Sequence, residues 1–262
     1  MAGCLAFAPE LAGGGEGYQD SYFDELARLE AANFWFRARN QLILWALQKH
    51  FKDAQNLLEI GCGTGFVLSG IAQTFPQMSL SGSEVSTNGL SHAARRIPQA
   101  NFFQMDARAI PFEAEFDTIG AFDVIEHINE DEAVMAQMFH ALKPGGGLLL
   151  TVPQHEFLWS QVDEHAFHVR RYHAGDLRTK LERAGFRVLT MTSFVSLLLP
   201  LMFVSRLARR KARQDFDVLA ELRLSPVANF VLKTALDFER GLIRTGVRFS
   251  FGGSLLVVAQ RP

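Results

Sequence analysis

The chain has 262 residues, of which 48% are hydrophobic, with 26 Lys and Arg against 28 Asp and Glu. This length and composition suit one domain with a sizeable core and argue against disorder, while a formal charge of −2 argues against broad binding to nucleic acid through net charge. Two cysteines, Cys4 and Cys62, are too few for a disulfide framework and favour a reducing, cytoplasmic location.

The amino-terminal part of the chain predicts a tail followed by helices. Residues 1–20 lack the basic start and long apolar run of a secretory signal, and we expect them to form a flexible tail. Residues 21–52 place apolar side chains at helical spacing, which predicts one or two cap helices.

Strands and helices then alternate along residues 53–193. The alternation predicts right-handed βαβ units and a parallel sheet covered on both faces, a doubly wound α/β domain. A closing strand is predicted within 254–262. The expected strands lie near 56–62, 78–84, 102–106, 116–124, 146–153, 186–193 and 254–261, and the expected helices near 64–75, 87–96, 131–142 and 175–184.

Residues 194–253 separate the last two strands and have the composition of helices. If the strand before them is parallel to the others, this insertion leaves the sheet at its carboxyl edge, where ligands of open α/β sheets bind. We therefore expect the insertion to cover a site. Its apolar run, 194–204, has eleven residues and contains Pro200, so no membrane-spanning helix is expected.

The sharpest local signal is LLEIGCGTGF at 57–66. Its glycines allow a tight turn and a close approach of the backbone to a ligand, but their spacing matches neither the dinucleotide fingerprint nor the phosphate loop. Glu59, in an apolar strand, would be costly to bury without a partner, which hints at a function.

This stretch resembles motif I of class I S-adenosylmethionine-dependent methyltransferases, in which an acidic residue precedes G-x-G-x-G. LSGSEVS, FFQMDARAIPF, AFDVIEHI and LKPGGGLLLTVP follow in the family's order. The resemblance covers roughly residues 40–193 and the last strand. It implies a Rossmann-like, mostly parallel seven-stranded sheet of order 3-2-1-4-5-7-6 with strand 7 antiparallel, and S-adenosylmethionine as the cofactor.

The resemblance also implies how the cofactor is held. Glu84 would accept hydrogen bonds from both ribose hydroxyls, a task suited to one carboxylate. Asp106 would bond the adenine amino group with Ala107 beside the ring, although Asp106 could instead cap a helix. The implied cofactor contacts are Glu59, Gly61, Cys62, Gly63, Gly65, Glu84, Val85, Asp106, Ala107 and Phe122.

Two segments supply candidate catalytic residues. DVIEHI resembles the E/D-x-x-E-H pattern of ubiquinone-pathway O-methyltransferases, in which Asp123, Glu126 and His127 could converge on a divalent ion; equally, His127 could simply pack under the cofactor, so no metal is assigned. The segment QHEFLWSQVDEHAFHVRRYH also resembles a subset of these methyltransferases. It lacks zinc-site spacing and is expected to form an active-site lid. His127 and His168 are the candidate general bases.

The rim of the site is expected to contact the substrate. In NFWFRARN, aromatic residues beside arginines would suit an amphipathic or anionic substrate, although ordinary helix packing explains them equally well. RLARRKAR follows an apolar run, so residues 194–213 could touch anionic lipid, with a solvated helix end as the alternative. The predicted substrate contacts are Trp35, Arg39, His155, Trp159, Arg171 and Tyr172.

The sequence thus predicts methyl transfer from S-adenosylmethionine to a small molecule, with oxygen favoured over nitrogen as the acceptor atom and a lipid-like or anionic substrate. Nucleic acid is not an expected partner, because the fourth-strand loop lacks the Asn/Asp-Pro-Pro-Tyr signature. A non-catalytic cofactor-binding scaffold is the alternative. A nicotinamide oxidoreductase is disfavoured by the glycine spacing.

Overall fold

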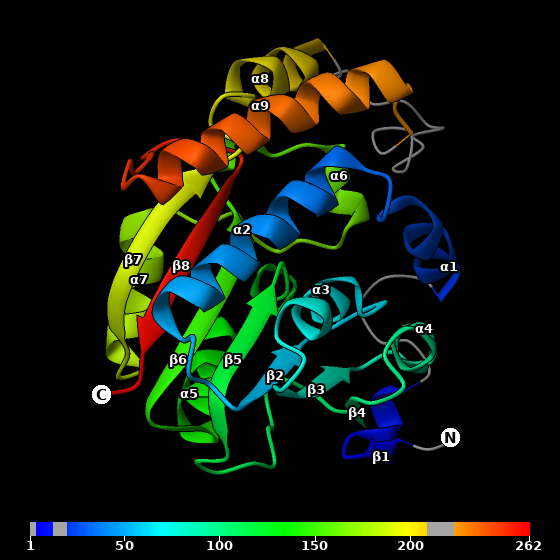
Figure 1. Cartoon of the computed structure of the whole chain (residues 1–262), viewed down its shortest axis with the longest axis vertical. Helices are drawn as coiled ribbons and strands as arrows, with labels where there is room; N and C mark the ends of the chain where they lie inside the picture. Colours follow the sequence, from blue (N-terminus) through cyan, green and yellow to red (C-terminus); the bar gives the residue numbers. More distant parts are fainter. Residues whose placement is uncertain (1–3, 13–19, 209–222) are drawn as a thin grey trace.

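The computed structural model describes residues 4–12, 20–208 and 223–262. A single eight-stranded sheet with the order β1-β4-β3-β2-β5-β6-β8-β7 runs through the described chain (Figure 1). β8 is antiparallel to both β6 and β7, and every other neighbouring pair is parallel. The strands are β1 (Leu5–Ala6), β2 (Asn56–Ile60), β3 (Ser79–Glu84), β4 (Asn101–Gln104), β5 (Phe116–Phe122), β6 (Leu142–Pro153), β7 (Arg187–Phe194) and β8 (Ser254–Gln260).

The predicted order of the seven core strands is confirmed, and β1 is an addition to it. Leu5 and Ala6 pair in parallel with the end of β4. The side chain of the buried Gln104 donates to the carbonyl of Ala8 at 2.7 Å and accepts from its N–H at 3.1 Å. A buried amide needs hydrogen-bond partners, and Gln104 finds them in this segment. The expectation of a flexible tail is therefore wrong for residues 5–8.

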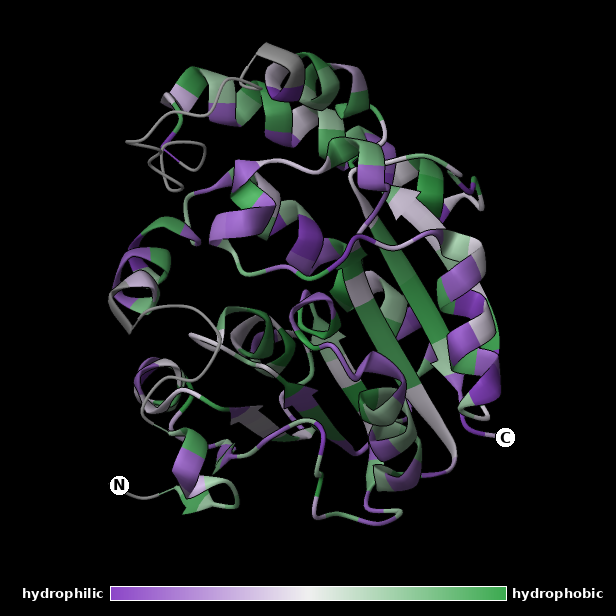
Figure 2. Ribbon diagram, turned by 180° about the vertical axis from the view of Figure 1, so that it is seen from behind, coloured by the Kyte–Doolittle hydropathy of each residue, from purple (hydrophilic) through white to green (hydrophobic). Residues whose placement is uncertain are grey.

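Helices cover both faces of the sheet. Two helices precede the core, as predicted, and Asn33 separates them by capping the second, where its side chain accepts from Trp35 N–H at 2.9 Å. Helices α2, α3 and α4 lie on one face, and α5 and α7 on the other (Figures 1 and 2). The helices are α1 (Asp20–Leu29), α2 (Phe34–His50), α3 (Phe66–Thr74), α4 (Thr87–Arg96), α5 (Asp131–Ala141), α6 (Gln161–His165), α7 (Ala174–Arg183), α8 (Leu199–Ala208) and α9 (Pro226–Arg244), with short 3-10 turns at Pro9–Leu11, Ile125–His127 and Glu156–Leu158.

The hydrophobic core has one layer on each face of the sheet. Along β8, Leu255 and Val257 belong to the layer under α5 and α7, whereas Leu256 and Val258 belong to the layer under α2 and α3. Successive side chains of a strand point to opposite faces, so a strand covered on both sides must be apolar throughout. Figure 2 shows these central strands in green and hydrophilic residues on the outer helices.

The insertion between β7 and β8 is helical, as predicted. Its helix α9 is tied to the body through Asn229, and a buried carboxylate on α9 holds the start of the insertion. Asn229 on α9 donates to the carbonyl of Ala32 at 2.8 Å and accepts from Phe34 N–H at 2.6 Å. Buried Glu239 accepts from the N–H groups of Ser196 and Leu197 at 2.7 and 2.8 Å. Because β7 and β6 are both antiparallel to β8, β7 is parallel to β6, and the insertion begins at the carboxyl edge of the sheet. Within the described residues, no helix combines the length and hydropathy needed to cross a bilayer.

Candidate active site

A cavity of about 940 Å³ opens at the carboxyl edge of the sheet. Its walls come from α1 and α2, from the loops after β2, β3, β4 and β5, from the segment between β6 and α7, and from the insertion. This volume is typical of small-molecule sites, and the position is the one expected for an open α/β sheet.

The glycine loop after β2 forms one wall. Gly61, Gly63 and Gly65 have φ angles of 63°, 50° and 75°, a conformation that other residues rarely adopt. A Cβ atom at Gly61 would lie 2.5 Å from Cγ2 of Val124, so a side chain there would force a displacement. Gly61 and Gly63 line the cavity. Gly65 instead begins α3, where a Cβ would lie 3.0 Å from Ala93, so its role is packing.

Glu84 lies at the end of β3 and is tied to the glycine loop. Its carboxylate accepts from the N–H groups of Gly63 at 3.1 Å, Val85 at 2.8 Å and Ser86 at 3.3 Å. Burial raises the pKa of Glu84, and these hydrogen bonds oppose the rise. The backbone thus fixes an acidic group on the cavity wall in one orientation.

Glu59 on β2 is a second buried acid on this wall. Its Oε2 atom has no hydrogen-bond partner among the described residues. Burial raises the pKa of Glu59 to about 8, and the positive charge of Arg39 acts in the opposite direction. A buried acceptor of this kind is suited to a ligand that brings a donor or a positive charge.

Asp106 follows β4 at the other end of the same wall. It accepts from Arg108 N–H at 2.8 Å and from Arg108 Nε at 2.9 and 3.1 Å. This is a turn rather than the start of a helix, so the alternative in which Asp106 caps a helix is wrong. Of the predicted cofactor contacts, Gly65 lies off the cavity, and those that line it are Glu59, Gly61, Cys62, Gly63, Glu84, Val85, Asp106, Ala107 and Phe122.

Glu30, at the carboxyl end of α1, is a cavity residue that the sequence did not reveal. It is buried, accepts from the hydroxyl of Thr64 at 2.7 and 2.8 Å, and pairs with Arg96 at 2.6 Å. These partners are 34 and 66 positions away. Glu30 therefore joins the cap helix to the glycine loop, a contact that no local pattern encodes.

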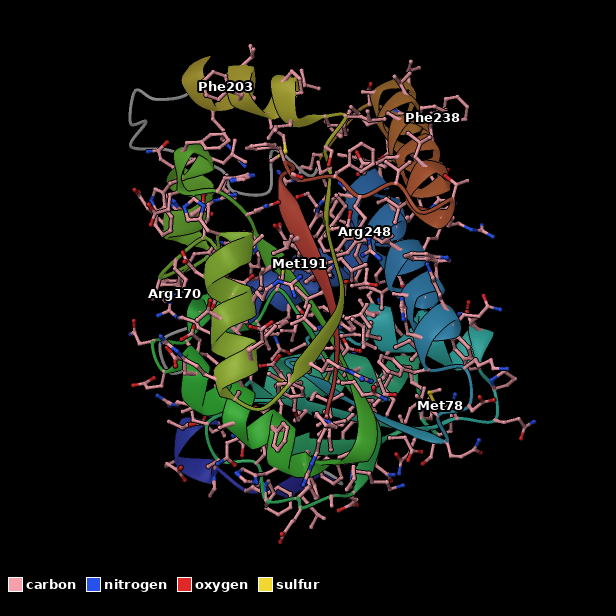
Figure 3. All side chains as sticks on the ribbon, turned by 90° about the vertical axis from the view of Figure 1, so that its left-hand side faces the viewer. Met78, Arg170, Met191, Phe203, Phe238 and Arg248 are labelled. Carbon is pink, nitrogen blue, oxygen red and sulfur yellow. The ribbon has the colours of Figure 1, made fainter. Side chains whose placement is uncertain are left out.

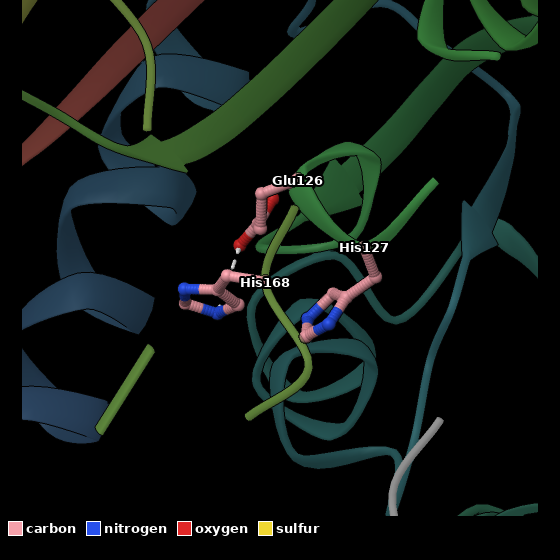
Figure 4. A group of neighbouring side chains, drawn as sticks. All are labelled: Glu126, His127 and His168. Atoms are coloured by element: carbon pink, nitrogen blue, oxygen red, sulfur yellow. Dashed lines mark ion pairs between the residues drawn. The ribbon is translucent and has the colours of Figure 1, made fainter. Parts of the chain in front are cut away.

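The opposite part of the cavity holds three side chains that point toward one another, namely Glu126, His127 and His168 (Figure 4). One ligand atom of each lies within 4.8 Å of the others, so the group could hold a metal ion. His168 Nε2 lies 4.0 Å from Glu126 Oε1, and the centroids of the two imidazole rings are 4.8 Å apart.

Asp163 on α6 orients His168. It is fully buried, accepts from Arg171 Nε at 2.8 Å, and lies 2.9 Å from His168 Nδ1. Burial raises the pKa of Asp163, but the hydrogen bond from His168 and the charge of Arg171 outweigh it, so the pKa is lowered. Since Asp163 is ionised, the proton of the contact is assigned to His168 Nδ1. In the neutral form of the ring, His168 Nε2 is then the acceptor that faces Glu126.

Burial shifts the pKa values of Glu126 and His127, the other two members of this group. Burial and then the negative charge of Asp123 raise the pKa of Glu126 well above its ordinary value, and neither of its oxygens has a hydrogen-bond partner in the described chain. Burial and then the charge of His168 lower the pKa of His127 to about 4. A pKa near 4 leaves His127 uncharged at neutral pH, and burial favours the neutral form of Glu126.

The two arginines predicted to contact the substrate line the cavity but already have acidic partners. Arg39 pairs with Asp123, and its guanidinium lies 4.5 Å from the ring centroid of Trp35. Arg171 is held by Asp163. The neighbouring Arg170 turns to Asp131 at 2.9 Å. Trp35 also lines the cavity.

Three other predicted substrate contacts lie away from the cavity. His155 is buried between the rings of Phe157 and Phe251, with centroids 5.0 and 5.3 Å away. Tyr172 is buried and donates to Asp131 Oδ2 at 2.8 Å, while Trp159 is partly exposed outside the cavity. The segment between β6 and α7 folds around Asp163, so only some of its side chains face the cavity.

Comparison with known proteins agrees with this geometry. Residues 25–191 match the model of a family described as "Methyltransferase domain". A "probable S-adenosylmethionine-dependent methyltransferase" of Mycolicibacterium smegmatis is 29% identical over 163 residues, which are 61% of this chain and 62% of the relative. Phosphoethanolamine N-methyltransferase 2 of Caenorhabditis elegans is 32% identical over 108 residues, 39% of this chain and 24% of the relative. The chain thus spans less than two thirds of these relatives.

Solved structures share the fold. Phosphoethanolamine N-methyltransferase 2 of Haemonchus contortus, solved with S-adenosyl-L-methionine, superposes with a TM-score of 0.60 at 20% identity, over 97% of this chain and 59% of that chain. At this identity the likeness establishes the Rossmann-like architecture and leaves the acceptor to be argued from the residues themselves.

Proposed function

The chain belongs to the methyltransferase domain family, and from this premise we propose that it transfers a methyl group from S-adenosylmethionine to a hydroxyl oxygen of a small molecule with an apolar portion. One observation carries the proposal. A single cavity joins a wall of backbone and acidic side chains, suited to the cofactor, to apolar side chains of the insertion, and an oriented histidine lines the same space.

The residues of the glycine loop and β3 fit the cofactor. Gly61 and Gly63 allow the main chain to approach the adenosyl group without a Cβ between them, and Glu84 offers a fixed carboxylate to the two ribose hydroxyls. The unpartnered oxygen of Glu59 suits the amino group. When bound, S-adenosylmethionine supplies the methyl group as an electrophilic carbon on positively charged sulfur.

His168 is the proposed general base. Methylation of a hydroxyl requires loss of its proton, and a positioned base contributes roughly 10²- to 10⁴-fold to such a step. Asp163 holds the imidazole with Nε2 free to accept that proton and would stabilise the resulting cation. His127 is less suited, because a pKa near 4 makes it a weak base at neutral pH.

The far wall of the cavity favours a lipid-like over an anionic acceptor. It is lined by apolar side chains, among them Leu198, Met202 and Leu232. Arg39 and Arg171 would have to give up their carboxylate partners before either could hold an anion, and breaking the buried pair of Arg171 with Asp163 is costly. A neutral, amphipathic alcohol or phenol meets both conditions.

A second mechanism uses the same three side chains as metal ligands. Glu126, His127 and His168 could hold a divalent cation, which would lower the pKa of an acceptor hydroxyl. In that case the reaction would be lost with a chelator and restored by a divalent cation. Activity that is unchanged by chelation supports the general-base role of His168.

The test is transfer of labelled methyl groups from S-adenosylmethionine to matched acceptors. We expect turnover with a long-chain alcohol or alkyl phenol, and little with the amine of the same chain or with a short, anionic alcohol. Preference for the amine would overturn the assignment of oxygen. Saturable binding of S-adenosylhomocysteine without turnover of any acceptor would favour the non-catalytic alternative.

A further inference from the structure

Helix α9 is apolar on two sides, and the described residues cover only one of them. Leu236 and Ile243 are buried on the side that faces the body of the protein. On the other side Val227, Phe230 and Phe238 are 74%, 71% and 63% exposed. Their spacing of three and eight positions, with exposed Val231 between them, forms a stripe along the helix. A bare apolar stripe on a helix is a feature of surfaces that bind something.

Helix α8 adds to this surface. Leu201, Phe203 and Val204 are exposed there. Figure 3 shows Phe203 on α8 and Phe238 on α9 at the same end of the molecule, the end that lies above α2 in Figure 1. We call the seven residues the lid surface: Leu201, Phe203, Val204, Val227, Phe230, Val231 and Phe238.

The insertion that carries the lid surface is basic. Its described parts, 194–208 and 223–253, contain six Lys and Arg against two Asp and Glu. Outside 194–253 the chain has 16 Lys and Arg against 23 Asp and Glu. Residues 209–222 lie outside the described residues; they hold the four remaining cations of the predicted basic run and three Asp and Glu. A positive, apolar end on an otherwise negative protein is complementary to an anionic lipid surface.

We propose that the lid surface docks on an anionic lipid bilayer, with α8 and α9 lying along the interface. Apolar side chains would enter the boundary between headgroups and acyl chains while the basic groups attract anionic lipid. The predicted contact at 194–213 thus extends to α9, whose stripe contributes more than half of the surface. A second copy of this chain fits less well, because a symmetric pair would bring two positive insertions together.

Docking would also place the cavity against the lipid. Leu201 is exposed by 56% and lines the cavity, so the lid surface is continuous with the cavity wall. An acceptor with an apolar tail could then enter without crossing water. This loading role rests on the proposed function, whereas the docking itself does not.

The experiment is flotation of the full chain with phosphatidylcholine vesicles, with and without phosphatidylglycerol. We expect binding to the anionic vesicles that weakens in high salt and falls by at least about tenfold when Phe230→Ser and Phe238→Ser are combined. Leu5→Ser is the matched control, because Leu5 is 65% exposed on β1, far from the lid surface. This control should bind like the natural chain.

Three results would overturn docking: no flotation with either vesicle, equal loss in the Leu5→Ser control, or a dimer in sedimentation that the Phe230→Ser and Phe238→Ser changes dissociate. Calorimetry with S-adenosylhomocysteine on the same variants keeps the two proposals apart. If the Phe230→Ser and Phe238→Ser variant binds S-adenosylhomocysteine but no longer floats with the vesicles, docking is supported. If the natural chain does not bind S-adenosylhomocysteine, the proposed function is wrong, and the docking proposal is unaffected.

Discussion

The two ends of the cavity are built differently. At the cofactor end, short-range backbone geometry makes the wall, through left-handed glycines and a carboxylate fixed by three nearby N–H groups. At the acceptor end, side chains from α2, β5, α6 and the insertion meet across long stretches of chain. One end can therefore be specified by a short motif, and the other depends on how distant segments pack.

Their charges differ as well. Glu59 at the cofactor end keeps an acceptor without a partner, whereas Arg39 and Arg171 at the acceptor end are neutralised by Asp123 and Asp163. The unpartnered oxygen of Glu59 suits a ligand that brings hydrogen-bond donors or a positive charge. The paired arginines present little net charge, which suits a neutral acceptor. Substitutions at four positions test this difference.

Replacement of His168 should have the largest effect. His168→Gln removes the proposed base and should lower kcat by roughly 10²- to 10⁴-fold, with affinity for S-adenosylhomocysteine retained. His165→Gln is the control, because His165 is exposed in the same segment and its Nδ1 lies 2.8 Å from the carbonyl oxygen of Gln161, away from Asp163. Single-turnover kinetics and calorimetry measure the two quantities. Full activity in His168→Gln would remove this residue from the chemistry.

Gly61→Ala should weaken ligand binding at the cofactor end. Its Cβ would meet Val124 at 2.5 Å in a left-handed conformation, and we expect affinity for S-adenosylhomocysteine to fall by about 100-fold. Gly145→Ala is the matched control, because Gly145 has a φ of 81° with nothing within 4 Å of the added carbon. Calorimetry should show normal binding for the control. Equal loss in both variants would mean that general backbone strain, and not the close approach, is responsible.

The same contrast explains what the sequence could predict. The strand order and the cofactor wall follow from local features, since apolar strands alternate with helices and each acid or glycine stands at a strand end. β1 escaped prediction because its pairing depends on Gln104, which is almost a hundred positions away. Glu30 escaped for the same reason, because its partners Thr64 and Arg96 are distant in sequence.

At the acceptor end, the sequence pattern did not predict which side chains face the cavity. The spacing of Trp159, His168, Arg171 and Tyr172 suggested one continuous lid. Asp163 instead collects Arg171 and His168, and Tyr172 turns inward to Asp131 in the core. Which side chains of an irregular segment face a cavity is decided by such buried pairs, and the linear order of residue types does not contain that information.

Glu59 should couple cofactor binding to protons. Burial holds its pKa at about 8, so it is mostly protonated at pH 7, and a positively charged ligand group beside it would favour ionisation. Binding should therefore release protons, and affinity should rise with pH by up to about tenfold per unit until it levels above pH 8. Calorimetry in two buffers of different ionisation enthalpy measures the release.

Two variants test this assignment. Glu59→Gln should abolish the proton release and flatten the pH dependence. Glu239→Gln is the control, because Glu239 is also a buried acid with a raised pKa but accepts from Ser196 and Leu197 within the insertion. Release that persists in Glu59→Gln would assign the proton to another group.

The smallest effect is expected at Trp35, one of two tryptophans that the sequence predicts as substrate contacts; the other is Trp159. Trp35 lines the cavity beside Arg39, whereas Trp159 is 38% exposed outside it. Trp35→Leu should raise KM for the acceptor by about fivefold with little change in kcat, because it removes aromatic contact and not the base. Trp159→Leu should leave both constants unchanged. Trp35→Phe keeps a ring for Arg39, and its KM should lie between those of the natural chain and Trp35→Leu. If the KM of Trp35→Phe equals that of Trp35→Leu, the effect belongs to the acceptor contact alone. If Trp159→Leu raises KM as much as Trp35→Leu does, the segment between β6 and α7 must move inward when the acceptor binds.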